Sequence, residues 1–315
     1  MKKDLLYIMY MGGPDSIEGI EEFLYNLFSD RTIIDFHVGG MLQNFIAKKI
    51  AKKRSKKVAP EYMKLGGQSP QLPHLKSLLE KIRPEYQRIT GRELETSIGM
   101  CYYHPYIKDS LKELEGREFE NIYVTTMYPQ YSYTTTGACF DRFNPLPKPR
   151  GNMVIKKFWH MNEKYNKCIT DRIFKAAEKL GKPLSECHIL FSAHSLPEYT
   201  VKKGDEYTMH IREQANYLIS KTNPRSSGLA YQSRTGPVKW VSPYTDQELV
   251  RLAQEKVDNV IVVPISFVSD HIETLIELDE QYIPEYEKSG LNIVRIESLN
   301  DSDDFAEAIL DIILN

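Results

Sequence analysis

Two polar clusters that directly follow apolar runs contain residues able to do metal or proton chemistry. His194 stands in Ser192-Ala-His-Ser-Leu-Pro197, and Glu273 and Glu277 follow the apolar residues 260–264. One imidazole and two carboxylates can bind a divalent metal ion, and imidazole suits transition ions in particular. Imidazole also exchanges protons near neutral pH. The three side chains therefore predict a metal site, a proton-transfer site or both.

Each of these residues also has a structural alternative. A lone histidine more often satisfies local backbone groups than it binds a ligand. Asp270 is a typical N-cap, and Glu273 three residues later has the spacing of a capping box. Glu273 and Glu277, however, lie four residues apart on one helical face, where like charges repel. A cation that passes along this face gives a reason for the pair, so both interpretations stay open.

A third cluster, Tyr128-Pro-Gln-Tyr-Ser132 followed by residues 133–137, is rich in hydroxyls and aromatic rings. Such a set can line a ligand site, but it can equally begin a helix with Ser or Thr as its cap. The sequence contains no P-loop, HExxH, GxSxG or GxGxxG motif, which argues against the enzyme classes that use them.

The elements that position these clusters alternate between strand and helix along the whole chain. Strands are expected at residues 5–9, 95–100, 122–127, 153–159, 188–192, 228–232, 260–264 and 292–296. Helices are expected at 106–114, 162–180, 207–221, 246–255, 271–283 and 303–314, with a further helix capped by Asp15 after Gly12-Gly13-Pro14. Near-continuous apolar strands that alternate with helices indicate parallel sheets covered on both faces. In such α/β sheets, ligands bind beyond the carboxyl ends of the strands, where the three clusters stand.

The length and composition fit two α/β units and exclude several other classes. The chain has 315 residues and a formal net charge of −2, which does not suggest a nucleic-acid binder. No run of 18 apolar residues occurs, and the apolar run at residues 5–9 is too short for a secretory signal, so a cytoplasmic protein is expected. The four cysteines form no CxxC pair and are expected to be free thiols.

Residues 36–57, which we call the lip, differ in composition from the rest. Apolar side chains such as Met41, Leu42 and Phe45 precede a stretch from Lys48 to Lys57 in which seven of ten residues are Lys or Arg. This pattern gives peripheral attachment to an anionic membrane, here the inner face of the cell membrane. A solvated basic helix is the alternative.

Seven motifs in chain order resemble those of the ferrochelatases, enzymes that insert ferrous iron into a porphyrin. The resemblance covers nearly the whole chain. The motifs are Met9-Tyr-Met-Gly-Gly-Pro-Asp15, Leu65-Gly-Gly-Gln-Ser-Pro70, Tyr128-Pro-Gln-Tyr-Ser132, Ser192-Ala-His-Ser-Leu-Pro197, Gly204-Asp-Glu-Tyr207, Gln232-Ser-Arg-Thr-Gly-Pro237 and Asp270-His-Ile-Glu-Thr-Leu275. The resemblance implies an α/β fold of two Rossmann-like, doubly wound parallel-sheet units of the chelatase type. We expect the first unit at 1–127 plus 301–315 and the second, with the metal site, at 128–300.

The resemblance also implies roles for individual residues. His194 and Glu273 match the family's catalytic pair, and Glu277 extends the metal site. Which of the pair accepts protons and which holds Fe²⁺ stays open. The expected porphyrin-binding residues are Met11, Tyr10, Lys64, Tyr102, Tyr131, Ser132 and Arg234.

The chain departs from some relatives at informative positions. A third carboxylate eight residues after Glu273 is replaced by Gln281, and an arginine before Tyr102 is replaced by Cys101. Relatives with an iron–sulfur cluster have a cysteine near Tyr133 and a cysteine-rich C-terminal extension, which this sequence lacks. We therefore expect no iron–sulfur cluster.

Met11 bears on which porphyrin is used. Relatives that act on coproporphyrin commonly have a tyrosine there, whereas those that act on protoporphyrin have an apolar residue. Met11 and Cys101 therefore favour protoporphyrin IX as the substrate and protohaem as the product. Three alternatives remain: coproporphyrin, sirohydrochlorin as in related chelatases, and a non-catalytic porphyrin or haem carrier.

Overall fold

The computed structural model describes residues 3–36, 38–234 and 238–315, and within these ranges the chain folds into two compact units. The first unit contains Met1–Tyr128, Ser132–Phe158 and Ile312–Asn315, and the second contains Pro129–Tyr131 and Trp159–Asp311. The last three residues of the sixth motif, 235–237, lie outside the described residues, as does His37 of the lip.

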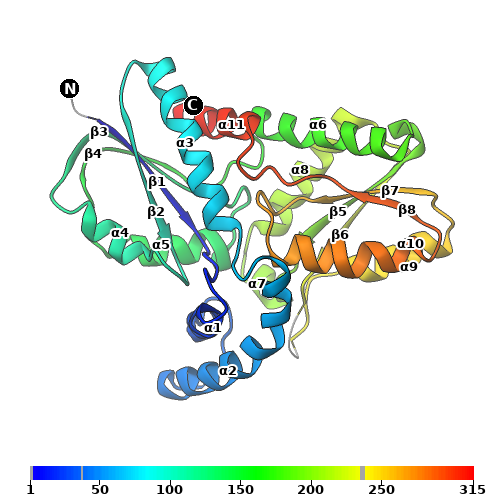
Figure 1. Cartoon of the computed structure of the whole chain (residues 1–315), viewed down its shortest axis with the longest axis horizontal. Coiled ribbons are helices and arrows are strands. Elements are labelled where there is room, and N and C mark those ends of the chain that lie inside the picture. The colour runs from blue at the N-terminus through cyan, green and yellow to red at the C-terminus, as the bar shows by residue number, and fades with distance from the viewer. Residues whose placement is uncertain (1–2, 37, 235–237) are drawn as a thin grey trace. The chain divides into compact units, whose positions relative to one another are not determined.

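The first unit is built on a four-stranded parallel sheet with the order β2-β1-β3-β4. Its strands are β1 (Asp4–Tyr10), β2 (Leu94–Met100), β3 (Glu118–Thr126) and β4 (Arg150–Lys156). Every residue of β1 is buried, as expected for a central parallel strand with both faces covered. Figure 1 shows β1 pointing toward helix α1 (Gly19–Ser29), so the loop after Tyr10 lies at the carboxyl end of this sheet.

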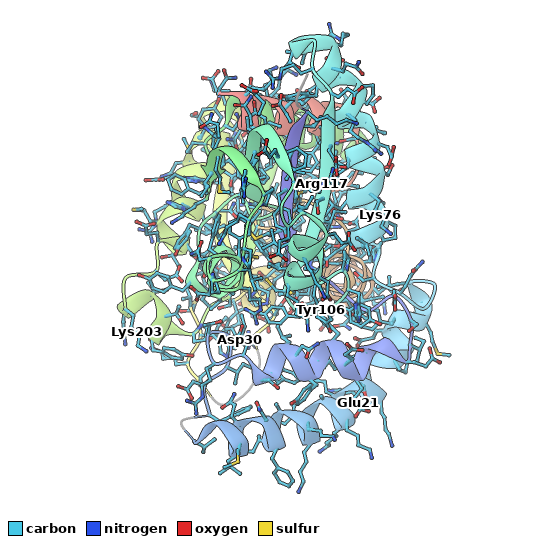
Figure 2. The ribbon with its side chains drawn as sticks, turned by 90° about the vertical axis from the view of Figure 1, so that its left-hand side faces the viewer. Glu21, Asp30, Lys76, Tyr106, Arg117 and Lys203 are labelled. Atoms are coloured by element: carbon cyan, nitrogen blue, oxygen red, sulfur yellow. The ribbon has the colours of Figure 1, made fainter. Side chains whose placement is uncertain are left out.

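Five α-helices are described in this unit: α1 (Gly19–Ser29), α2 (Gly40–Lys64), α3 (Gln71–Thr90), α4 (Ile107–Glu113) and α5 (Ala138–Phe143). The helices α1 and α2 lie side by side in Figures 1 and 2 and pack against each other. The lip, residues 36–57, ends inside α2, because that helix continues to Lys64. None of the helices in the described ranges is long and apolar enough to cross a membrane.

The expected cap of α1 by Asp15 is wrong. The helix begins at Gly19, and its backbone N–H is bonded to the Ser16 hydroxyl at 3.1 Å. The Asp15 carboxylate instead accepts a hydrogen bond from the Tyr103 hydroxyl at 2.7 Å. The Asp15 side chain is thus bonded to a residue 88 positions away, a partner that local spacing does not reveal.

The second unit contains a second parallel sheet with the order β6-β5-β7-β8. Its strands are β5 (His188–His194), β6 (Ser226–Gln232), β7 (Asn259–Pro264) and β8 (Asn292–Arg295). Every residue of β7 is buried, and apolar side chains of β5, β7 and β8 share one core with helix α9 (Thr245–Gln254). The carboxyl ends of β5, β6 and β7 bring His194, Gln232 and Pro264 to one edge.

The helices described after the first unit are α6 (Glu163–Leu180), α7 (Glu198–Lys202), α8 (Tyr207–Thr222), α9 (Thr245–Gln254), α10 (Ile283–Glu287) and α11 (Asp303–Leu314), labelled in Figure 1. Asn162 caps α6, its side chain accepting the Tyr165 N–H at 2.9 Å. The expected helix at 271–283 is a π-helix at Glu273–Tyr282. Wide turns of this kind are rare and are frequent at functional sites.

All of the expected strands occur within a few residues of their predicted positions. The expected unit boundaries differ from the observed ones in two places. β4 pairs with β3 and therefore belongs to the first sheet, although residues 128–300 were assigned to the second unit. Residues 301–311 belong to the second unit, and the first has only Ile312–Asn315 of this end. Strand–helix alternation gives the order of elements along the chain but not their neighbours in space.

Candidate active site

His194 is the last residue of β5, and its imidazole is held in one orientation. Its Nδ1 lies 2.6 Å from the Ser195 carbonyl oxygen, so Nδ1 carries a proton and donates it. The Ser266 hydroxyl accepts the His194 N–H at 2.9 Å, and the Tyr207 hydroxyl donates to its carbonyl at 3.0 Å. These bonds aim Nε2 at a carboxylate, which is not the arrangement of a histidine that only satisfies its own backbone.

That carboxylate belongs to Glu273, the first residue of the π-helix. Its Oε1 lies 3.5 Å from His194 Nε2, and its Oε2 lies 3.4 Å from His271 Nε2. The ring of His271 is fixed in turn, because Nδ1 lies 3.0 Å from the Ser269 carbonyl oxygen. Glu273 thus lies between two imidazoles, and the capping-box alternative is wrong. The Asp270 carboxylate accepts the Thr274 hydroxyl instead.

Charge coupling shifts the pKa values of His194 and Glu273 in opposite directions. Burial alone lowers the pKa of His194, but Glu273, the Ser195 carbonyl and Glu277 outweigh it and raise this pKa to about 9. Burial raises the pKa of Glu273, but the charges and hydrogen bonds of His194 and His271 outweigh it, and this pKa lies well below its usual range. Without a metal ion, the pair at neutral pH is therefore an imidazolium and a carboxylate.

Glu277 lies one turn further along and is anchored to the end of β6. The Ser233 hydroxyl donates to it at 2.5 Å, the Ser233 N–H at 3.1 Å and the Tyr282 hydroxyl at 2.9 Å. These donors stabilise a second carboxylate beside Glu273 despite the repulsion between like charges. The result is a row of two fixed carboxylates that starts at His194.

Asp270 holds the turn that leads into the π-helix. Its carboxylate accepts from the Ser298 hydroxyl at 2.7 Å and the Asn300 amide at 2.8 Å, and lies 3.2 Å from the Arg295 guanidinium. Burial alone raises the pKa of Asp270, but Arg295 and these donors outweigh it and lower this pKa. The sequence predicts Asp270 as a helix cap and places Asp270 and His271 in the seventh motif, but it predicts no site role for His271 or Arg295.

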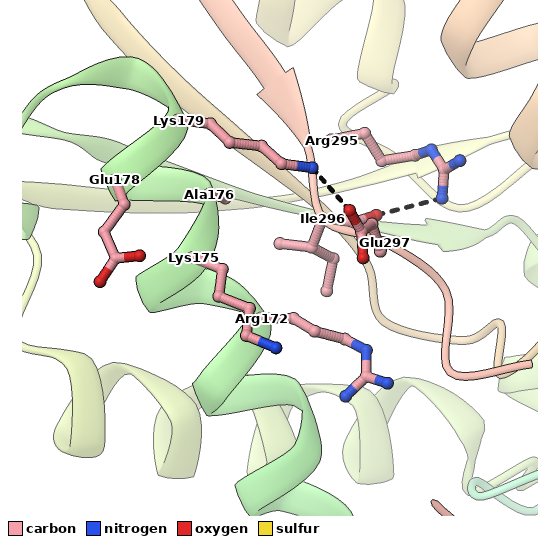
Figure 3. Close-up of a pocket in the computed structure, with 8 residues that line it drawn as sticks. All are labelled: Arg172, Lys175, Ala176, Glu178, Lys179, Arg295, Ile296 and Glu297. Carbon is pink, nitrogen blue, oxygen red and sulfur yellow. Dashed lines mark hydrogen bonds and ion pairs between the residues drawn. The ribbon is translucent and has the colours of Figure 1, made fainter. Parts of the chain in front are cut away.

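A cavity of about 490 Å³ in the same unit is not part of this site. It lies between α6 and the end of β8, where Arg172, Lys179 and Glu297 are among its lining residues (Figure 3). Its charges are largely paired. The Lys179 ammonium lies 2.6 Å from the Glu297 carboxylate, and the Arg172 guanidinium lies 2.6 Å from the Asp304 carboxylate. Neither His194 nor Glu273 lines it.

Comparison with known proteins identifies the family to which the chain belongs. The ferrochelatase family model matches residues 4–315. The ferrochelatase of Aquifex aeolicus is 38% identical over 320 residues, which cover 100% of this chain and 99% of the relative. That of Geobacter metallireducens is 36% identical, with 99% and 98% covered. The chain belongs to the ferrochelatase family. It is therefore a lyase that inserts a metal ion into a porphyrin.

Solved structures support the same fold at much lower identity. SirB of Bacillus subtilis, determined with Fe³⁺, has a TM-score of 0.52 and 11% identity, with 100% of this chain and 97% of SirB covered. A multi-domain Deinococcus radiodurans protein with structural similarity to chelatases has a TM-score of 0.55 and 10% identity, with 99% and 55% covered. The expected chelatase-type α/β fold is confirmed.

Several of the porphyrin-binding residues expected from the sequence belong to the first unit. Tyr10 is buried, its ring 5.0 Å from that of Tyr128, and its hydroxyl lies 3.3 Å from the Gln71 amide nitrogen. Met11 follows β1 and is half-buried, and Lys64 is exposed at the end of α2.

Tyr102 and Ser132 of the first unit are engaged within the protein. The Tyr102 hydroxyl donates to Asp30 at 2.8 Å, and Arg142 lies 2.7 Å from Asp30 and over the Tyr102 ring. Arg142 is a cation that sequence reasoning missed. Ser132 is fully buried and caps the turn that follows by accepting the Thr134 N–H, so the helix-start interpretation of the third cluster is confirmed.

Tyr131 and Arg234 belong to the second unit. The Tyr131 N–H donates to His210 Nδ1 at 3.1 Å. The Arg234 guanidinium forms two hydrogen bonds with Asp246, at 2.8 and 2.9 Å, and stacks over the Tyr244 ring. Of the residues predicted from sequence, the structure thus brings together His194, Glu273 and Glu277.

Proposed function

We propose that this ferrochelatase-family enzyme inserts Fe²⁺ into protoporphyrin IX to form protohaem, the final step of haem biosynthesis. One observation carries the assignment of the metal site. The Glu273 carboxylate lies 3.5 Å from His194 Nε2 and 3.4 Å from His271 Nε2, with Glu277 next in the row. Imidazole and carboxylate together suit ferrous iron, and imidazole also suits proton transfer.

In the proposed mechanism, Glu273 and Glu277 receive the metal substrate and His194 accepts protons. His194 is protonated at rest because Glu273 raises its pKa to about 9, a rise that outweighs the effect of burial. A doubly charged substrate ion that reaches Glu273 replaces the imidazolium as partner of that carboxylate. His194 then loses the charge that holds its proton and releases the proton to solvent. Neutral His194 takes up one pyrrole N–H proton, and repetition of this step removes the second as the ion enters the ring.

The proposed preference for protoporphyrin IX rests on two features of the first unit, the pairing of Arg142 and the side chain of Met11. Coproporphyrin has four propionates and protoporphyrin has two, and burying a carboxylate without a partner is unfavourable. Arg142 is already paired with Asp30. Met11 offers a flexible thioether that packs on vinyl groups and on a flat ring but no hydroxyl for a propionate. We further propose that six residues lie next to the bound porphyrin: Tyr10, Lys64, Tyr102, Tyr131, Ser132 and Arg234. Tyr102 and Ser132 are already hydrogen-bonded within the protein, so we propose that they shape the site rather than bind a propionate.

The test is anaerobic insertion of Fe²⁺, followed by absorbance, with protoporphyrin IX and coproporphyrin in parallel. We expect a higher kcat/KM for protoporphyrin IX, and a Met11→Tyr variant is expected to narrow the difference. A clear preference for coproporphyrin would refute the substrate assignment. Stoichiometric porphyrin binding without insertion would instead support a carrier.

We also propose that the protein is cytoplasmic and attaches peripherally to the inner face of the cell membrane through the lip. α2 packs on one side against α1 and turns its other side outward (Figure 2). The side chains of Met41 and Phe45 are 92% and 54% exposed, and the lysine-rich stretch begins three residues later. Exposed apolar side chains next to dense positive charge favour an anionic lipid surface.

Vesicle sedimentation tests this attachment. Protein is expected to sediment with anionic vesicles at low salt and to be released by a double change, Met41→Ser with Phe45→Ser. Ile89→Ser on α3 is the matched control, because Ile89 is also exposed, at 51%, but lies outside the lip. Equal recovery on neutral and anionic vesicles would exclude the lip as an electrostatic membrane anchor.

We propose in addition that the enzyme works without an iron–sulfur cluster. The cysteines at 101, 139, 168 and 187 are all buried free thiols. Cys101 and Cys139 are close, with Sγ atoms 3.2 Å apart, but the other two belong to the second unit. Acid-labile sulfide in stoichiometric amount in the purified protein would overturn this proposal.

A further inference from the structure

A second group of metal-ligating side chains lies in the second unit and has no part in the mechanism above. It consists of His160, His210 and Glu213, which we call the second histidine cluster. His210 and Glu213 are three residues apart on α8 and therefore share one helical face. His160 precedes α6, and its backbone N–H donates to the Pro129 carbonyl at 3.0 Å. One candidate ligand atom from each of the three lies within 4.8 Å of the others.

The cluster is closed on one side and open on the other. The His160 and His210 side chains are buried, and their rings are stacked with centroids 4.1 Å apart and an interplanar angle of 20°. His160 Nε2 lies 2.9 Å from a Glu213 carboxylate oxygen, and the Glu213 side chain is 49% exposed. An ion can therefore arrive from solvent at Glu213 and meet the imidazoles behind it.

Both histidines are ready to act as ligands. Burial lowers the pKa of His160, although Glu213 opposes this, and burial and His160 together lower the pKa of His210. Neutral imidazole is the form that binds metal ions. The His160–Glu213 hydrogen bond alone accounts for two members of the cluster. The Tyr131 N–H accounts for Nδ1 of His210, and a shared ion gives a reason for the stacking of the His210 ring on that of His160.

We propose that His160, His210 and Glu213 form a second site for a divalent transition-metal ion, separate from the insertion site. Two imidazoles and one carboxylate suit zinc, iron, cobalt or nickel. Ligand atoms at about 2.1 Å from one ion are roughly 3.4 Å apart, so the group closes slightly as the ion binds. The ion takes the place of the proton that His160 Nε2 now shares with Glu213. That proton moves to Nδ1 of the His160 ring, which stays neutral, and water completes the coordination of the ion.

Occupation of this site changes the surroundings of Tyr131. His210 Nδ1 now accepts the Tyr131 N–H at 3.1 Å, so the ring proton of neutral His210 is on Nε2. An ion at Nε2 moves that proton to Nδ1, and an ion at Nδ1 displaces the N–H directly. In both cases the Tyr131 N–H loses its acceptor. The site is thus coupled to the Tyr128–Ser132 motif.

The experiment measures Co²⁺ binding by calorimetry and visible absorption in a parent protein that carries His194→Ala and Glu273→Gln. These two changes disable the insertion site, so remaining affinity reports the second histidine cluster. Adding His210→Gln or Glu213→Gln is expected to weaken Co²⁺ binding at least tenfold. His104→Gln is the matched control, because His104 Nε2 also lies near a carboxylate, 3.6 Å from Glu22, but outside the cluster. It is expected to leave the affinity unchanged.

Hydrogen exchange provides a second measurement that does not depend on activity. Co²⁺ is expected to speed exchange of the Tyr131 amide in the parent and not in the Glu213→Gln variant. Glu213 is half-exposed, so its replacement preserves the fold, which a thermal unfolding curve checks. The proposal is overturned if the parent does not bind Co²⁺, or if Glu213→Gln and His210→Gln bind it as tightly as the parent.

Discussion

The two ends of strand β5 carry the same residue type in opposite states. His188 begins the strand and His194 ends it. The pKa of His188 is lowered to about 4, whereas that of His194 is raised to about 9. The same strand therefore presents a neutral imidazole at one end and an imidazolium at the other.

Burial favours the neutral form at both ends, so burial does not explain the difference. At His188, burial acts with the charge of Arg251, and its Nδ1 is paired with the neutral Ser226 hydroxyl at 2.8 Å. At His194, the Glu273 and Glu277 carboxylates outweigh burial. The carboxyl ends of parallel strands gather segments from several parts of the chain, and here the segment after β7 supplies both carboxylates. The surrounding carboxylates, rather than burial, therefore account for the raised pKa of His194.

The largest effect on insertion is expected from removal of the carboxylate that distinguishes the two ends. Glu273→Gln should slow Fe²⁺ insertion by about 100-fold or more, the usual scale for loss of a group that positions metal and proton transfer. Glu248→Gln is the control, because Glu248 also acts on a β5 histidine, His188. The insertion rate of Glu248→Gln should match that of the wild type. A comparable loss in both variants would show that the effect is not specific to Glu273.

The same Glu273→Gln change should move the titration of His194 in the metal-free protein. With its main partner removed and burial retained, the pKa of His194 should fall from about 9 to below the ordinary 6.5. NMR titration of the labelled histidines measures this directly, with His188 as an internal reference. A His194 titration that stays near 9 would mean that Glu273 is not the cause.

Glu277→Gln should have a smaller effect. Glu277 is the last of the contributions that raise the pKa of His194, and it stays hydrogen-bonded to Ser233 and Tyr282. We expect insertion to slow by about three- to tenfold, within the range of a modest electrostatic contribution. Tyr282→Phe, which removes one donor and leaves the charge, should slow it less. A loss as large as that of Glu273→Gln would place Glu277 in direct contact with the reaction.

The smallest effect on insertion is expected at the other end of β5. His188→Gln should leave insertion unchanged but alter stability in acid. Because the folded pKa of His188 is depressed, its neutral form contributes stability above pH 6.5 that is lost as the pH falls toward about 4. Urea unfolding of the variant should therefore show a weaker loss of stability across this window. An unchanged acid profile would show that His188 does not titrate there.

Much of the fold followed from the sequence because its signals are local. Buried parallel strands are continuous apolar runs, so all of the strands and the placement of His194 and Glu273 after strand ends were predictable. β4 was assigned to the wrong unit because a strand's neighbours are not written in its own residues.

The surroundings of the site were less predictable because they come from distant segments. Asp270 is held by Arg295, Ser298 and Asn300, 25 to 30 residues further along the chain. The stacked pair of His160 and His210 is separated by 50 positions in sequence and carries no spacing motif. Arg142 reaches Asp30 over 112 residues. Such pairs become visible only when the sheets bring the segments together.

A paired assay tests whether the histidine at the carboxyl end of β5 carries metal insertion. His194→Ala and His188→Ala are compared for Fe²⁺ insertion and, in the same samples, for porphyrin binding by fluorescence quenching. We expect His194→Ala to lose insertion by about 100-fold or more while it still binds porphyrin, and His188→Ala to insert normally. Near-normal turnover by His194→Ala would refute the proposed role of His194.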